Sequence, residues 1–97
     1  MAGHKFPRAV LENIQRERLD LGEKKHKDYS SAIDTLGLSG VNGIAVRLLD
    51  KVGRALSLTK ANASDINFES IRDTFIDIGN YADYAVAMID GKWHGEN

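Results

Sequence analysis

Residues 67–91 hold the longest uninterrupted helical pattern of the chain, and this pattern restricts the fold more than any other feature. At about 100° per residue, its apolar side chains share one arc of a helix. They are Ile71, Phe75, Ile78, Ala82, Ala85, Val86 and Ile89. We expect this arc to be the buried side of the helix. Asn67 is expected to cap the helix at its beginning, and Gly91 to end it in a left-handed conformation.

A polar ridge runs beside the apolar arc, at spacings of four, four and three residues. It consists of Glu69, Asp73, Asp77 and Asn80, with Tyr84 one turn beyond. Acids stacked in register on a helix repel one another, so this ridge needs a counter-charge. A basic side chain, a metal ion or a cation-bearing ligand would each supply one.

Two further helices are predicted before this one. Residues 7–26 begin with Pro7 in the first turn and place Val10, Leu11, Ile14 and Leu21 on one arc. Residues 44–58 form the next helix, with a mostly basic ridge opposite its apolar side. That ridge comprises Arg47, Asp50, Lys51 and Arg54, and the apolar side comprises Ala45, Leu48, Leu49, Val52, Ala55 and Leu56. A short helical piece capped by Ser30 or Ser31, a loop over residues 38–43 and a polar linker over 59–66 complete the pattern.

Length and composition favour one all-α domain over residues 1–97. The chain has one proline and few β-branched runs, which leaves little room for a sheet. We therefore predict a small antiparallel helical bundle of three main helices plus a short one. Its ordered core is expected to span about 7–91 and its mobile tail 92–97, with Trp93 docked on the body. A chain of 97 residues buries a modest share of its surface, so a homo-oligomer is expected.

The formal net charge of −1 offers no overall field for nucleic-acid polymers or anionic membranes, so neither partner is expected. The absence of cysteine excludes disulfides and thiolate sites. No stretch resembles a signal peptide or a membrane span, which indicates a cytoplasmic protein. His4, His26 and His94 share no metal-ligand spacing and are expected to be solvated.

The basic ridge and the acidic ridge are expected to face one cleft, because a short connector makes their helices pack antiparallel. Three outcomes remain open. The ridges form direct salt bridges; or Asp50, Glu69, Asp73 and Asp77 hold Mg²⁺; or the cleft is a metal-free nucleotide pocket. In the pocket, Arg47, Lys51 and Arg54 would bind phosphate, and Asn80, Tyr81 or Tyr84 would read a base. Lys27 and Tyr29, from a short basic run and its flank, are candidates for the same cleft.

Three segments together resemble the family called nucleotide modification associated domain 1, which occurs in phages and bacteria. They are KHKDY at 25–29, RLLDKVGR at 47–54 and ESIRDTFIDIGNYA at 69–82. That family is similar to the all-α nucleoside triphosphate pyrophosphatases of the MazG type. The resemblance implies an all-helical oligomer that handles a nucleotide.

The chain departs from MazG-type enzymes in its acids. Those enzymes carry ExxE and ExxD motifs that hold Mg²⁺, whereas the ridge on 44–58 has only Asp50 among three bases. We therefore expect a phage-type protein that binds and sequesters nucleotides, including cyclic nucleotide immune signals, in the host cytoplasm. The alternative is a Mg²⁺-dependent nucleotide pyrophosphohydrolase that serves nucleotide-pool or modified-base metabolism. No catalytic base stands out for that reaction.

Overall fold

The computed structural model describes residues 5–29, 40–60 and 66–93, and within these ranges all regular structure is helical. The helices are α1 (Arg8–Tyr29), α3 (Gly40–Thr59) and α4 (Phe68–Ile89). The prediction of an all-α fold with three main helices is therefore confirmed for this part of the chain. The predicted short helix and the end of the tail, 94–97, lie outside the described residues.

The helices α1 and α3 are longer than predicted. Helix α1 continues through Gly22 to Tyr29, and α3 begins at Gly40 instead of residue 44. The prediction of a loop over 38–43 is thus wrong for 40–43, which forms the first turn of α3. Gly43 and Ile44 are buried there, and burial outweighs the helix-propensity cost of glycine, about 1 kcal/mol.

Both predicted ends of α4 are confirmed. The Asn67 side chain accepts a hydrogen bond from the Ser70 backbone N–H at 3.0 Å. At the other end, Gly91 has a φ of 72°. The Gly91 and Lys92 amides donate to the carbonyls of Met88 and Ala87 at 3.0 and 2.8 Å, which is the Schellman pattern.

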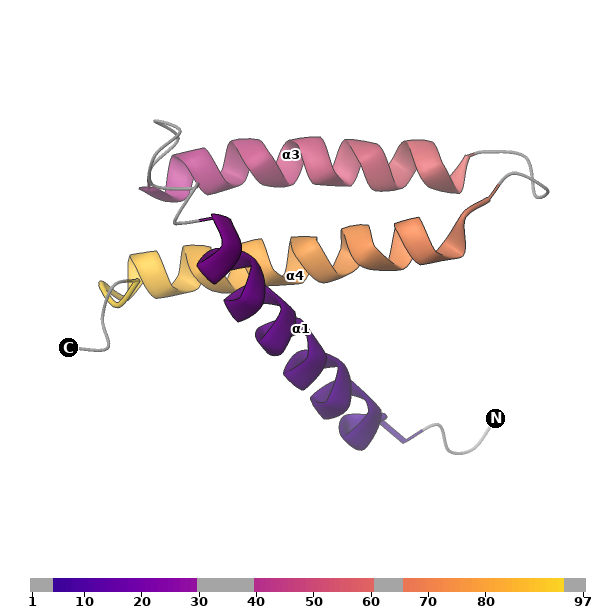
Figure 1. Cartoon of the computed structure of the whole chain (residues 1–97), viewed down its shortest axis with the longest axis horizontal. Helices are drawn as coiled ribbons and strands as arrows, with labels where there is room; N and C mark the ends of the chain where they lie inside the picture. Colours follow the sequence, from indigo (N-terminus) through magenta and orange to yellow (C-terminus); the bar gives the residue numbers. More distant parts are fainter. Residues whose placement is uncertain (1–4, 30–39, 61–65, 94–97) are drawn as a thin grey trace.

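Helices α3 and α4 lie side by side, and the chain enters α4 at the end of the pair where it leaves α3 (Figure 1). Helix α1 crosses α4 obliquely, and its N-terminal half leads away from the pair (Figure 1). No helix in the described ranges is long and apolar enough to cross a membrane.

The buried side of α4 differs from the predicted arc. Phe75, Val86 and Ile89 are all more than half exposed, whereas Thr74, Ile76 and Asn80 are buried. The burial of a polar side chain such as Thr74 costs little when its hydrogen bond is made. Its hydroxyl donates to the Ser70 carbonyl at 2.8 Å. Three large side chains of the predicted arc are therefore left exposed by the described residues, whereas Ile71, Ile78 and Ala85 are partly buried.

The crossing of α1 over α4 depends on a glycine and on ion pairs. A methyl group at Gly22 would lie 2.6 Å from the Tyr84 hydroxyl oxygen, so the two helices approach closely only because no side chain stands there. On one side of this point Arg72 binds the Glu17 carboxylate through two nitrogens, each at 2.7 Å. Arg18 pairs with Asp83 nearby. Charge complementarity thus fixes how α1 lies on α4.

We expect Gly22→Ala to destabilise the protein. The clash with the Tyr84 hydroxyl should lower the free energy of unfolding by about 1–3 kcal/mol, more than alanine gains in helix propensity. Gly53→Ala is the matched control, because a methyl group there meets nothing within 4 Å. That variant should gain about 0.4–1 kcal/mol in urea denaturation. Equal stabilisation by both substitutions would contradict the close crossing.

The Glu17–Arg72 pair should contribute to the acid sensitivity of the fold. The hydrogen bonds from Arg72 hold the pKa of Glu17 below its ordinary value of 4.5. A lowered folded-state pKa gives stability that is present above pH 4.5 and is lost as the pH falls through that lower value. Glu17→Gln should therefore lose less stability than the parent protein between neutral pH and pH about 3 in urea denaturation. Glu23→Gln, which removes an exposed carboxylate outside these ion pairs, should lose as much as the parent.

Candidate functional site

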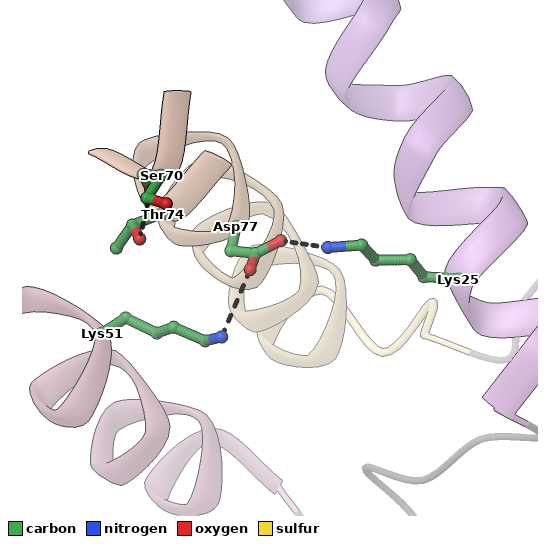
Figure 2. Close-up of polar contacts among 5 residues, drawn as sticks. All are labelled: Lys25, Lys51, Ser70, Thr74 and Asp77. Carbon is green, nitrogen blue, oxygen red and sulfur yellow. Dashed lines mark hydrogen bonds and ion pairs between the residues drawn. The ribbon is translucent and has the colours of Figure 1, made fainter. Parts of the chain in front are cut away.

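One carboxylate, that of Asp77 on α4, joins all three described helices. Lys25 of α1 donates from Nζ to Oδ1 at 2.8 Å, and Lys51 of α3 donates from Nζ to Oδ2 at 3.2 Å. Figure 2 shows the two lysines reaching Asp77 from different sides. At Asp77, two ammonium groups thus supply the counter-charge that the acidic ridge requires, and one of them belongs to the basic ridge.

The cluster of Lys25, Lys51 and Asp77 is partly shielded and carries an excess positive charge. The Asp77 side chain is 18% exposed, whereas Lys25 and Lys51 are 43% and 33% exposed. Each ammonium has three N–H donors, and Asp77 occupies one from each lysine. The remaining donors, on partly exposed side chains, are suited to anionic oxygens.

Aromatic rings continue from this cluster in a row. The Lys51 ammonium lies 5.9 Å from the ring centroid of Tyr81, at cation–π distance. Tyr81 meets Tyr84 edge-on at 5.8 Å, and Tyr84 lies 4.8 Å from Trp93. The ring of His26 completes the row, 6.0 Å from Trp93. The predicted docking of Trp93 on the body is therefore confirmed.

The hydroxyl of Tyr84, in the middle of this row, has a raised pKa. Burial raises the pKa of its phenol, with smaller contributions from Tyr81, Asp77 and Asp83 in the same direction. Arg18 lowers it slightly. The phenol therefore stays neutral at physiological pH and keeps its hydrogen for donation.

Arg47, in the first half of α3, has a guanidinium nitrogen that makes no hydrogen bond with the described residues. Its Nε is buried, and no residue in the described ranges accepts a hydrogen bond from it. A buried donor without an acceptor costs about 1–3 kcal/mol, so an acceptor from outside these ranges would be favourable there. Arg54, the other arginine of the basic ridge, is exposed and pairs with no described carboxylate.

The acids proposed for Mg²⁺ do not form a metal site among the described residues. No three carboxylate or imidazole groups in these ranges come close enough to share an ion. Asp50, Glu69 and Asp73 are exposed on separate turns, whereas Asp77 is half-buried and neutralised by lysines. Two ammonium groups already satisfy the charge that would have attracted the ion.

The structure brings together only some of the residues predicted to bind a ligand. Lys51, Tyr81 and Tyr84 meet in the cluster and its aromatic row. Asn80 is buried at 6% exposure, with its amide nitrogen 3.1 Å from where a methyl group on Gly22 would lie, so it does not face solvent. The side chains of Lys27 and Tyr29 are outside the described part of α1.

Lys25 was missed, although the sequence holds a signal for it. Arg18, Gly22 and Lys25 follow one another at spacings of four and three and so share one arc of a helix. In the structure this arc is the one that lies on α4.

The comparisons with known proteins identify no relative. No family model matches the chain, and neither a curated protein nor a solved structure shows significant similarity to it. The resemblance to nucleotide modification associated domain 1 therefore stays a prediction.

Asp77→Asn should destabilise the protein by about 1.5–3 kcal/mol, because it removes the anion from two charged hydrogen bonds in a partly shielded place. Asp73→Asn, one turn earlier and exposed, should change stability by at most about 0.5 kcal/mol. Urea denaturation of both variants checks this. Equal effects would show that Asp77 does not join the helices.

Proposed function

We propose that the protein binds nucleotides at the surface formed by Lys25, Lys51 and the aromatic row. One observation carries this proposal: two lysines from different helices converge on one carboxylate, directly beside a row of edge-on and tilted aromatic rings. In this arrangement the ammonium groups can bind phosphate, and the neighbouring aromatic rings can contact a base. The protein is the oligomeric antiparallel bundle expected from its sequence.

Phosphate oxygens would take the ammonium donors that Asp77 leaves available. Charge-assisted hydrogen bonds of this kind are shorter and about twice as strong as neutral ones. Because the lysines are already held by Asp77, little side-chain entropy is lost on binding. The exposed Arg54 adds a cationic group on α3.

The base would contact Tyr81 or Tyr84. Stacking of a base on an aromatic ring contributes about 1–3 kcal/mol and tolerates different bases. The Tyr84 hydroxyl points to Gly22 at the helix crossing, so the contribution of Tyr84 to binding is its ring. Such a site holds a linear or a cyclic nucleotide, since both present phosphate oxygens and a base.

Binding without turnover fits this site best. The carboxylate at its centre is occupied by two lysines, so it is poorly placed to take a proton from water. We therefore propose sequestration of nucleotides, including cyclic nucleotide immune signals, in the cytoplasm of an infected host. The hydrolytic alternative would require Mg²⁺ and would release pyrophosphate.

The test is a titration of purified protein with linear and cyclic nucleotides, followed by calorimetry and by the fluorescence of Trp93, the single tryptophan. Lys25→Gln and Lys51→Gln should each weaken binding about 10–100-fold, because each removes charged hydrogen bonds. Lys24→Gln is the matched control: it removes the same charge one residue away, from an exposed position. It should change affinity by less than about threefold.

Chromatography of the bound nucleotide separates the alternatives. Recovery of the intact nucleotide, with or without Mg²⁺, supports sequestration. Pyrophosphate release that depends on Mg²⁺ would replace it with the hydrolytic function. Equal loss of affinity in the Lys24 and Lys25 variants would remove the proposed site.

A further inference from the structure

Helices α3 and α4 share a large apolar surface that the described residues leave uncovered. Its members are 40–72% exposed. They are Val41, Leu49, Val52 and Leu56 on α3, and Phe68, Phe75, Val86 and Ile89 on α4. We call these eight residues the apolar face.

The residues of the apolar face lie on the same side of the helix pair. On α3, the residues of the apolar face are turned by about 100° around the helix axis from Ile44 and Ala55. On α4, they are turned by about the same angle, and in the same rotational sense, from Thr74 and Tyr81. Equal rotations place residues on one common side when neighbouring helices run in opposite directions, as α3 and α4 do in Figure 1. The opposite rotation brings Lys51 and Asp77 together, which agrees with this geometry. The apolar face therefore lies on the side of the helix pair opposite the Lys51–Asp77 contact.

The apolar face has the size and composition of an interface. Its arcs contain no Asp, Glu, Lys or Arg. At about 100–200 Å² per large side chain, the exposed part amounts to roughly 500–900 Å². A standard interface buries about 800 Å² per partner, and a monomer rarely exposes an apolar patch larger than a few hundred Å².

The described part of the chain also has a small buried core. Within the described ranges only Ile44, Ala55 and Ile76 form a buried apolar core. The radius of gyration is 15.7 Å, against about 13 Å for a compact domain of this length.

We propose that a second copy of this chain covers the apolar face. The α3–α4 pair of one protomer packs on the same pair of its partner, so that four helices enclose one core through a two-fold, self-complementary interface. An uncharged face fits an identical uncharged face, whereas a charged partner would leave its charges unpaired. The cluster around Asp77 lies on the other side of the pair and stays accessible.

The mass of the full chain in solution tests this inference. Light scattering after size-exclusion chromatography should give at least twice the 10.7 kDa of one chain. Leu49→Glu should reduce the mass to that of one chain, because it places a charge in the interface. Leu19→Glu, at an equally exposed leucine of α1, should leave the mass unchanged. A monomeric parent protein, or equal masses for both variants, would overturn the proposal.

Thiol labelling gives a second measurement that does not depend on how the charged variant folds. The chain has no cysteine, so Leu49→Cys and Leu19→Cys each introduce a single thiol. The two positions are 72% and 69% exposed in one chain, so a monomer would label both at similar rates. A covered apolar face should slow labelling at position 49 at least tenfold relative to position 19. Similar rates would show that no second copy sits there.

Discussion

The contact of Asp77 with two lysines is the interaction on which the arrangement of the described helices depends. The ammonium groups come from α1 and α3, and the carboxylate comes from α4. Without the carboxylate, two cations would face each other in a partly shielded place, at a cost in solvation and repulsion. Without the lysines, the acid would stand next to Asp73, another acid four residues earlier on the same face of α4. The three charged side chains therefore stabilise one another in this place.

This contact also divides the molecule into two sides with different chemistry. The side with Asp77 holds α1, the lysines and the aromatic row. The other side is the uncharged apolar face of α3 and α4. A ligand on the first side and a second copy on the other would not compete for the same residues. A small chain thus supports recognition and self-association at once.

Local features were predictable from the sequence, whereas contacts between distant residues were predictable only in part: a salt bridge between the two ridges was one of three outcomes left open, and Lys51 and Asp77 form one. Asn67 and Gly91 act on backbone groups a few residues away, so their capping roles follow from residue type. The apolar arc of α4 was assigned to the buried side of the helix, but within the described residues Phe75, Val86 and Ile89 are exposed and only Ile71, Ile78 and Ala85 are partly buried. A helical pattern shows which side avoids water and not which surface covers it. The roles of Gly22 and Lys25 were not predicted for a similar reason: they depend on where α1 crosses α4.

Nuclear magnetic resonance of the lysine side-chain ammonium groups tests the central claim most directly. The ¹⁵Nζ signals of Lys25 and Lys51 can be assigned with the corresponding glutamine variants and followed during titration with a nucleotide. Our account predicts that these two signals shift together and saturate at the same concentration as the fluorescence change of Trp93, while the Lys24 signal stays in place. Nucleotide binding that leaves both signals unmoved would contradict it.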